Sequence, residues 1–440
     1  MHLLYNFSIF ITSKLILLIT FFSKKMSLFV DGRKTVFDTL KESINPDDKT
    51  IWFHCASLGE YEQGVPIMEK TKELFPNYKI IVTFFSPSGF EVKKNATLAN
   101  IVLYLPIDTV SNSKKFIELA HPSLAIFIKY EFWPNYLFQL KEKNIPLFLV
   151  SGLFRKDQLF FKPYGGFMRK VLNSFDHFFV QDETSKVLLN NINIKETTVS
   201  GDTRFDRVSN QLLQDNNIAF ISEFKQNNLC IVCGSTWPED EAVLIDYINK
   251  ASDDVKFIIA PHEINASKIE SFRKNIQKQS SLFSIKEETN IAEYNVLIID
   301  TVGLLTKIYS HADIAYIGGG MGDTGLHNIL EPATFGVPIV IGNHFVKFPE
   351  AKELKELKGL FSISNATECS KILEKLVTDK NARIESGKIA KAFIENNKGA
   401  TNTTMNYIKH LIALNLKPSE SGSILRCITD IKMLLNSSIF

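Results

Sequence analysis

The sequence predicts an α/β protein made of two doubly wound, Rossmann-like domains that follow an N-terminal membrane helix. Three observations support this class: short apolar segments typical of buried strands alternate with helical ones, one polar stretch interrupts the alternation, and the first 22 residues are rich in apolar side chains. Strands that alternate with helices along a chain form a parallel sheet with helices on both faces. A chain of 440 residues is long enough for two such domains with substantial cores.

The composition is that of a folded protein, with 45% hydrophobic and 22% charged residues. A net charge of +2 gives no general signature of nucleic-acid binding, so we expect no nucleic-acid partner. The five cysteines form no disulfide framework, which is typical of a reducing compartment. Cys230 and Cys233 are three residues apart in a predicted strand and point to opposite faces, so we expect buried side chains and no zinc site.

Residues 1–25 are predicted to form a membrane anchor. Lys14 is the only formal charge in the first 22 residues, and about twenty apolar residues can span a bilayer as a helix. No small-residue cleavage site of the secretory kind follows, and the next residues include Lys24 and Lys25, which place the downstream domains in the cytoplasm. Polar residues such as Asn6 leave an alternative open, in which the helix lies on the membrane without crossing it.

The first domain is predicted over residues 26–215 and opens with the strand 50–54 and the helix 62–75. Further apolar segments continue the same alternation of strands and helices. The strands predicted for the rest of this domain are residues 78–83, 123–128, 145–150, 175–180 and 197–200.

The second domain is predicted over residues 216–415, and the joint lies in the polar segment 206–225, which is rich in Asn and Gln. A second series of apolar segments follows this joint. The predicted strands are residues 229–233, 255–259, 296–299, 314–317 and 338–341. Residues 416–440 are predicted to form a C-terminal tail, for which the sequence indicates no function.

A glycine-rich run follows the predicted strand 314–317. Three consecutive residues, Gly318, Gly319 and Gly320, leave backbone amides uncovered, so an anionic group can approach them closely. A helix is expected to begin at His327, and helix N-termini favour phosphate. Glu331 then lies one turn after His327, where its carboxylate could hold ribose hydroxyls. The run indicates a nucleotide-sugar site, and a plain glycine turn between strand and helix is the alternative.

Two loops of the first domain carry candidate reactive groups after predicted strands. Glu60 stands at the head of a helix, where it is a candidate general base for an attacking sugar hydroxyl. A carboxylate that caps the helix is the alternative of equal weight. Glu131 and Trp133 follow another strand and could grip a polyhydroxylated acceptor. The alternative for this pair is a core tryptophan beside a surface acid.

The second domain offers further polar groups at strand ends. Ser235 and Thr236 could bind a phosphate or a sugar carboxylate, although a plain N-cap explains them nearly as well. His262 could contact the nucleotide, and a loop histidine satisfied by its neighbours is the alternative. No Asp-x-Asp motif occurs in a strand-end context, and neither His nor Cys shows metal-ligand spacing, so we predict no metal requirement and no cofactor.

Together these segments resemble the 3-deoxy-D-manno-octulosonic acid (Kdo) transferases of lipopolysaccharide assembly, glycosyltransferases of the GT-B fold. The resemblance spans nearly the whole chain. It implies two Rossmann-like domains that face a central cleft. The matching motifs are HCASLGE (54–60), YEFWP (130–134), GDTRFD (201–206), GSTWPEDE (234–241), APHE (260–263) and GGGMGDTGLHNILEPATFGVP (318–338).

The resemblance implies an inverting glycosyltransferase that moves Kdo from CMP-Kdo to a lipid A precursor of the lipid IVA type. It implies that Glu60 is the base and Glu131 a second essential acid, and that the domains lie on the cytoplasmic face of the inner membrane. The implied acceptor contacts in the first domain are His54, Ser57, Gly59 and Trp133. The implied CMP-sugar contacts in the second domain are Ser235, Thr236, His262, Gly318, Gly319, Gly320, Gly325, His327, Asn328 and Glu331.

Two departures from the family pattern stand out. Many members have Pro-Arg-His where this chain has Ala-Pro-His ending at His262, so another cation such as Lys347 or Arg204 has to replace the arginine, or CMP binds more weakly. Many members also carry an acid where this chain has Lys129. The alternative functions are another GT-B enzyme that uses a UDP-sugar and a membrane-tethered binding module without activity.

Overall fold

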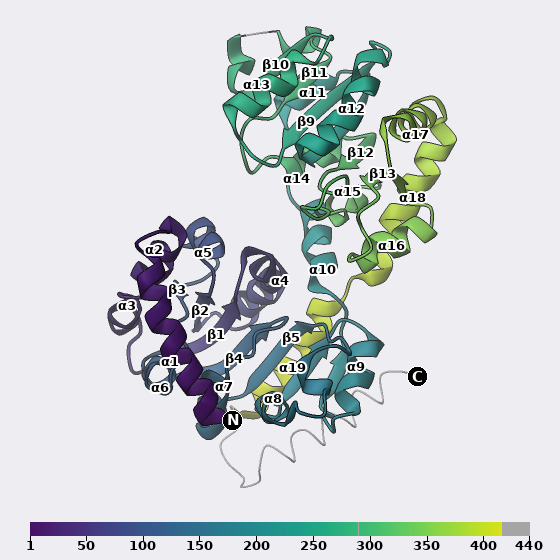
Figure 1. The fold of residues 1–440 in the computed structure, drawn as a ribbon. Coiled ribbons are helices and arrows are strands. Elements are labelled where there is room, and N and C mark those ends of the chain that lie inside the picture. Colours follow the sequence, from purple (N-terminus) through teal and green to yellow (C-terminus); the bar gives the residue numbers. More distant parts are fainter. Residues whose placement is uncertain (289, 416–440) are drawn as a thin grey trace. The chain divides into compact units, whose positions relative to one another are not determined.

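The computed structural model describes residues 1–288 and 290–415, and these residues form two compact α/β units (Figure 1). Among the described residues the first unit comprises Met1–Arg207 together with residues 398–415, and the second comprises Val208–Asn397 apart from residue 289. The boundary lies inside the polar segment that the sequence suggested as the joint.

The last described helix, α19 (Ala400–Asn415), belongs to the first unit, whereas the sequence placed residues 216–415 in the second domain. The reason is apolar packing: Tyr407 is buried and contacts Phe148 edge-to-face at a centroid distance of 5.6 Å. The helix thereby completes a core that the first sheet leaves open on one face. The predicted tail, residues 416–440, lies outside the described residues.

Within the described residues the first unit has a seven-stranded sheet in the order β3-β2-β1-β4-β5-β6-β7, with every pair parallel. Helices cover both faces, as the alternating sequence predicts. The strands are β1 (Lys49–Cys55), β2 (Tyr78–Phe84), β3 (Ile101–Tyr104), β4 (Pro122–Ile128), β5 (Leu147–Gly152), β6 (His177–Val180) and β7 (Thr197–Val199). The helices are α1 (His2–Ile19), α2 (Lys24–Asp31), α3 (Val36–Ser43), α4 (Leu58–Leu74), α5 (Pro87–Lys93), α6 (Val110–Ala120), α7 (Pro134–Glu142), α8 (Gly166–Leu172), α9 (Glu183–Asn190) and α10 (Thr203–Ser209).

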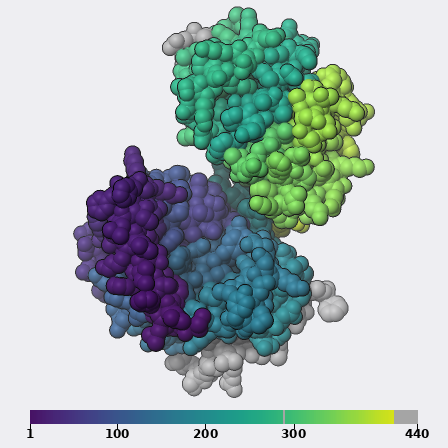
Figure 2. All heavy atoms as spheres, viewed as in Figure 1, coloured from purple at the N-terminus to yellow at the C-terminus, as the bar shows by residue number. Residues whose placement is uncertain are grey.

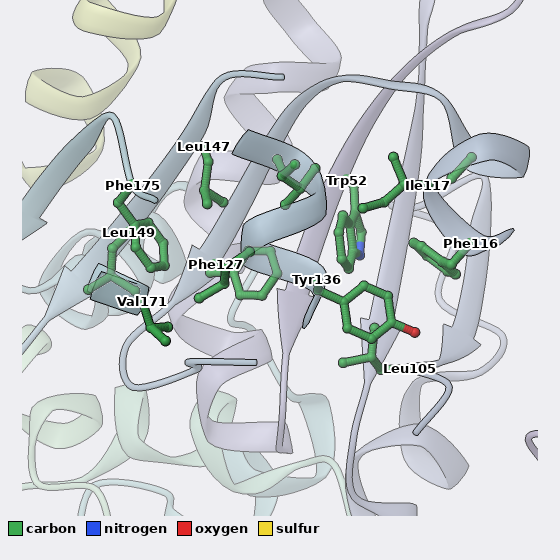
Figure 3. Packing of buried hydrophobic residues seen from close by; sticks show 14 of the residues in the cluster. Trp52, Leu105, Phe116, Ile117, Phe127, Tyr136, Leu147, Leu149, Val171 and Phe175 are labelled. Carbon is green, nitrogen blue, oxygen red and sulfur yellow. The ribbon is translucent and has the colours of Figure 1, made fainter. Parts of the chain in front are cut away.

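Large aromatic side chains fill the core of this unit. The Trp52 ring packs against Phe116, Phe127 and Tyr136 at centroid distances of 4.8, 5.0 and 5.7 Å (Figure 3). Its indole N–H donates to Thr83 Oγ1 at 2.8 Å, so the one polar atom of this buried side chain is satisfied. This packing fixes β1, whose end leads through residues 56–57 into α4 and Glu60.

The second unit repeats the plan with a seven-stranded parallel sheet, again counting only described residues, in the order β10-β11-β9-β8-β12-β13-β14. Cys230 and Cys233 are fully buried and form no disulfide on its central strand, which confirms the expected burial of both side chains. The strands are β8 (Leu229–Thr236), β9 (Val255–Pro261), β10 (Ser280–Leu282), β11 (Val296–Ile298), β12 (Ile314–Ile317), β13 (Ile339–Gly342) and β14 (Leu360–Ile363). The helices are α11 (Ala219–Lys225), α12 (Pro238–Lys250), α13 (Ala266–Lys274), α14 (Leu305–Ile308), α15 (Leu330–Thr334), α16 (Pro349–Glu356), α17 (Ala366–Thr378) and α18 (Lys380–Asn397).

Each sheet has a topological switch point, where the strand order reverses. In the first unit it lies between β1 and β4, and in the second between β8 and β12. Ligands of doubly wound sheets bind outside the carboxyl ends of the strands at this point, because the loops there diverge. The motif loops after β1, β4, β8 and β12 therefore start at the positions where such a fold binds its ligands.

Candidate active site

Glu60 occupies the first turn of α4, directly after β1. Its Oε2 accepts the backbone N–H of Ser57 at 2.8 Å and the Ser57 hydroxyl at 3.1 Å, so the carboxylate does cap the helix. Oε1 has no hydrogen-bond partner among residues 1–288 and 290–415. Burial and the charge of Glu131 raise the pKa of Glu60, against the lowering by Ser57 and His54. A higher pKa makes the carboxylate a stronger base, so capping and base chemistry are compatible.

Glu131, His54 and Trp133 form one hydrogen-bonded cluster after β1 and β4. Glu131 Oε2 accepts the indole N–H of Trp133 at 2.7 Å and lies 3.2 Å from His54 Nε2. The fully buried His54 ring is held on its other side, with Nδ1 2.8 Å from Thr83 Oγ1. The Glu131 side chain is only 13% exposed, so the alternative of a plain surface acid is wrong. Its position is fixed from two sides.

A cavity of about 380 Å³ opens beside this cluster. Its lining is mainly aromatic and contains one carboxylate, the mixture typical of small-molecule sites. The lining residues are Tyr130, Glu131, Phe132, Trp133, Gln158, Phe160 and Met168. The cavity therefore gives the sequence-predicted pair Glu131 and Trp133 a space in which to contact a ligand.

The backbone is strained at the ends of two switch-point strands. Lys129 has φ +70° directly after β4, and its N–H donates to Val150 O at 2.9 Å. Ser235 has φ +55° at the end of β8, where the register with β9 shifts between Gly234 and Thr236. A left-handed conformation costs energy in residues other than glycine and occurs often at functional sites. Both turns redirect the chain at a motif loop.

The glycine run after β12 uses its amides differently from the prediction. Gly318 N–H donates to Gly234 O at 2.9 Å, and Gly319 N–H donates to the buried carboxylate of Asp240 at 2.8 Å. Two of the three amides that we expected to be uncovered are therefore occupied. Gly320 O accepts the N–H of a residue after β13, which fixes the end of the run.

Close packing explains why glycines stand here. A Cβ on Gly318 would lie 2.2 Å from Ser235 O, a distance that side chains do not tolerate. A Cβ on Gly319 would lie 2.1 Å from Gly325 O, and Gly319 also has φ +86°. The run thus folds directly onto the Ser235 loop, as a glycine turn between strand and helix does.

The helix after the run begins at Leu330, not at His327 as predicted. His327 N–H bends back to donate to Gly318 O at 3.1 Å, and the Asn328 side chain accepts the N–H of Leu330 at 3.1 Å. These contacts hold both residues in the loop before the helix. Glu331 is held by Asn328 Nδ2 at 3.2 Å and by a threonine hydroxyl of α14 at 3.1 Å.

Trp237, which we did not single out from the sequence, joins two predicted site histidines into a stack. Its indole N–H donates to His327 Nε2 at 3.1 Å, and its ring stacks on His262 at a centroid distance of 4.5 Å. The two imidazoles are 4.4 Å apart. Burial and the neighbouring His262 lower the pKa of His327 to about 4. Since an indole N–H only donates, Nε2 accepts and the proton of neutral His327 sits on Nδ1.

Asp240 is the second residue that sequence reasoning missed. The side chain is fully buried and accepts the N–H of Trp237 at 3.0 Å, the N–H of Gly319 at 2.8 Å and the Tyr316 hydroxyl at 2.9 Å. Burial raises the pKa of Asp240, against these hydrogen bonds. The available signal was its place at the third position of a predicted helix, where acids cap helices.

Thr236 is buried, and its hydroxyl donates to Glu241 at 3.1 Å, so it supports the loop. Ser235 is half-buried. Of the two cations expected to replace the missing arginine, Arg204 pairs with Asp202 at 2.8 Å, and Lys347 is exposed in the second unit. Among the described residues no cluster of three or more His, Cys, Asp or Glu side chains could hold a metal ion.

Comparison with known proteins points in the same direction as the motifs. A family model described as 3-deoxy-D-manno-octulosonic-acid transferase matches residues 32–207. The chain is 26% identical to a 3-deoxy-D-manno-octulosonic acid transferase of Chlamydia trachomatis, over 87% of this chain and 91% of that relative. It is also 26% identical to a bifunctional glycosyltransferase/methyltransferase of Fusobacterium nucleatum, over 91% of this chain and 61% of that longer protein.

Solved structures confirm the fold class. A putative UDP-N-acetylglucosamine 2-epimerase from Listeria monocytogenes matches 85% of this chain and 99% of its own with a TM-score of 0.59. At 13% sequence identity the likeness shows the fold alone: two parallel-sheet α/β units of the GT-B kind. The expected apolar N-terminal helix is present as α1, which by length and composition could cross a membrane.

Proposed function

This chain belongs to the family of Kdo transferases and is a glycosyltransferase of lipopolysaccharide biosynthesis, and from this premise we propose that it moves Kdo from CMP-Kdo to a lipid A precursor with inversion at the anomeric carbon. The observation that carries the proposal is the pair of acids at the switch point of the first sheet, Glu60 after β1 and Glu131 after β4, within a sequence similar to Kdo transferases over 87% of its length. The likeness to UDP-sugar enzymes concerns the fold only, so it does not favour a UDP-sugar donor.

In the proposed reaction Glu60 is the general base. The acceptor hydroxyl oxygen forms the bond to the anomeric carbon while the bond from that carbon to the CMP phosphate oxygen breaks on the opposite side, and the hydroxyl proton passes to Glu60. The unpartnered Oε1 suits this step, because Oε2 is held by Ser57. A Cβ on Gly59 would meet nothing closer than 4.0 Å, so the backbone beside Glu60 leaves room for an acceptor.

We assign the acceptor to the first unit. Glu131 is proposed as the second essential acid, because Trp133 and His54 hold its carboxylate at the edge of the aromatic cavity. There it can accept hydrogen bonds from acceptor hydroxyls. Its charge also contributes to the raised pKa of Glu60, so the two acids act on one proton transfer.

We assign CMP to the second unit. Because two glycine amides are occupied, Gly318, Gly319, Gly320 and Gly325 serve chiefly to shape the loop. The proposed donors to the phosphate are the Nδ1–H of His327 and the Ser235 hydroxyl, supported by the buried Thr236. The remaining proposed CMP contacts are His262, Asn328 and Glu331, the last held where it can accept ribose hydroxyls.

Membrane attachment completes the proposal. Residues 1–25 are proposed to hold the enzyme on the cytoplasmic face of the inner membrane, where the acyl chains of a lipid A precursor stay in the bilayer. The support is α1, which is long and apolar enough to reach across a membrane. The proposal requires no metal ion and no cofactor.

Product mass tests the function directly. The purified full-length protein is incubated with CMP-Kdo and a lipid A precursor, and the expected product is heavier by one or more Kdo residues. Glu60→Gln is expected to lose transfer and keep CMP binding, whereas Glu73→Gln, a surface acid of the same helix, should keep both. Turnover of a UDP-sugar with no use of CMP-Kdo would refute the proposal.

A further inference from the structure

Helix α1 has one face on the first unit and one face outward (Figure 1). The residues that face the unit are spaced three or four apart, the period of one helical face, and are half-buried. They are Tyr5, Asn6, Ile9, Ser13, Ile16 and Thr20. Half-buried residues therefore recur on one side of the helix along its length.

Hydrogen bonds fix the N-terminal end of α1 to α7. The Tyr5 hydroxyl donates to Asp108 Oδ2 at 2.6 Å, and the buried Asp108 carboxylate also accepts two backbone N–H groups in the first turn of α7. The His2 ring bonds Asn135 Oδ1 at 2.8 Å, and Asn135 Nδ2 donates to Asn6 Oδ1 at 2.9 Å. This set is here called the α1 latch. It fills the hydrogen-bonding capacity of polar groups that would be costly to bury alone.

The other end of α1 is fixed through α2, which follows after a short turn. Phe29 of α2 is buried in the same unit. Arg33 donates to the backbone oxygens of Leu105 at 2.8 Å and Phe85 at 2.8 Å, and its guanidinium lies 3.6 Å from the Phe29 ring centroid. Both ends of α1 are thus bound to one globular body.

This double attachment excludes a membrane-spanning course for α1. The 18 residues of α1 measure about 27 Å, close to the roughly 30 Å of a bilayer core. A spanning helix has its two ends on opposite sides of the bilayer. The first unit lies on one side of the bilayer. It therefore cannot contact both ends of a spanning α1 through the latch and the Arg33 contacts at the same time.

The outward face fits a lipid surface. The first 30 residues contain Lys14, Lys24 and Lys25 and no acidic residue, so the charge complements anionic headgroups. Lys170 stands beside the N-terminal end, in a cavity that Met1 also lines. Figure 2 shows α1 in purple on the surface of the first unit. The exposed apolar side chains are Leu3, Leu4, Phe7, Phe10, Ile11, Leu15, Leu17, Leu18, Ile19, Phe21 and Phe22.

We propose that α1 lies flat in the cytoplasmic leaflet of an anionic phospholipid bilayer, docked to the first unit by the α1 latch, and does not cross the membrane. This inference rests on the proposed membrane attachment and specifies that the helix lies on the membrane instead of crossing it. Since α7 begins directly after Trp133, the latch also ties the membrane helix to the cluster of Glu131, His54 and Trp133. The latch thereby holds the acceptor site at a fixed height above the lipid surface.

Spin-label depth measurements test the mode. Labels are placed on the full-length protein by Leu4→Cys, Ile11→Cys and Leu18→Cys, one at a time in a Cys427→Ser background whose other cysteines are buried. The protein is bound to vesicles of phosphatidylethanolamine and phosphatidylglycerol, and the accessibility of each label to oxygen and to a nickel chelate gives its depth. Flat docking predicts one common depth for the three outward positions. An Ile11 label at the bilayer centre with the other two near opposite headgroups would overturn the proposal.

A matched pair of variants tests the latch. Tyr5→Phe removes the hydrogen bond to Asp108, so the Leu4 label should become more mobile, whereas Ser8→Ala, whose hydroxyl bonds only within α1, should leave it unchanged. Equal mobility in both variants would refute the latch. If the protein does not bind vesicles but still transfers Kdo to a detergent-dissolved acceptor, flat docking is overturned and the proposed function stands. Loss of that transfer in the unaltered protein would instead contradict the proposed function.

Discussion

Replacing Trp237 with Phe removes one hydrogen bond from His327 and keeps an aromatic ring against His262. In the native protein the indole N–H occupies His327 Nε2, so protonation of this nitrogen has to break that bond. Burial and His262 remain in the variant and continue to hold the pKa low. The substitution therefore measures how much of the lowering of the His327 pKa comes from the hydrogen bond with Trp237.

The size of the effect follows from the energy of such a bond. A neutral hydrogen bond contributes ~0.5–1.5 kcal/mol, and 1.36 kcal/mol corresponds to a tenfold change in a protonation constant. From a native pKa of about 4, the pKa of His327 in the variant should rise by up to about 1. The tautomer should also change, because Nε2 becomes free to carry the proton.

Nitrogen-15 NMR of the histidine rings measures both quantities. The native protein should show His327 as the neutral Nδ1–H form at neutral pH, with titration near pH 4. The pKa of His327 is 6.5 in the unfolded chain and about 4 in the folded protein. As the pH falls, the unfolded chain therefore binds a proton on this side chain at a higher pH than the folded protein does. Stability is thus full above that pH and falls as the pH drops from 6.5 towards 4. A native His327 that titrates near 6.5, or that carries its proton on Nε2, would refute the reasoning.

Three further substitutions test other parts of the two units in the full-length protein. Glu60→Gln should lower kcat for Kdo transfer about 10²- to 10⁴-fold, the usual contribution of a general base, with little change in CMP affinity by calorimetry. Asp240→Ala leaves three buried donors without an acceptor, so urea unfolding should show a loss of about 3 kcal/mol, and an unchanged midpoint would contradict its role. Gly318→Ala places a Cβ 2.2 Å from Ser235 O and should weaken CMP binding, whereas Gly166→Ala, with its nearest atom at 3.8 Å, should not.

The sequence predicted the interior strands of both sheets and missed three of the four edge strands in the described residues. Central strands such as β1 and β8 are apolar on both faces, so they appear as continuous apolar runs. The three strands that were not predicted, β3 (Ile101–Tyr104), β10 (Ser280–Leu282) and β14 (Leu360–Ile363), all lie at a sheet edge. These edge strands are only three or four residues long, which leaves too few positions for a clear strand pattern. The return of α19 to the first unit depends on long-range packing, which periodicity does not reveal.

For the candidate site, the sequence predicted which loops carry it. It did not predict that several polar groups of these loops would hydrogen-bond to one another. Strand ends and helix starts placed Glu60, Glu131 and Ser235 correctly at the switch points. Trp237 and Asp240 were missed because a tryptophan and an acid at a helix start are ordinary helix features until their partners are known. Those partners come from β12 and the glycine run, far away in the sequence.

The internal use of these groups bears on how the proposed site would bind the donor phosphate. Asp240 takes Gly319 N–H and Gly234 O takes Gly318 N–H, so the run has fewer amides to offer than its three glycines suggest. The negative charge of the buried Asp240 carboxylate also repels an anion that approaches the loop, such as the proposed donor phosphate. His327 is neutral and carries its proton on Nδ1, so it offers the proposed site a donor without a full charge. With no arginine beside Pro261, the proposed CMP site would rely more on hydrogen bonds than on charge, so we predict that the affinity for CMP varies little with salt.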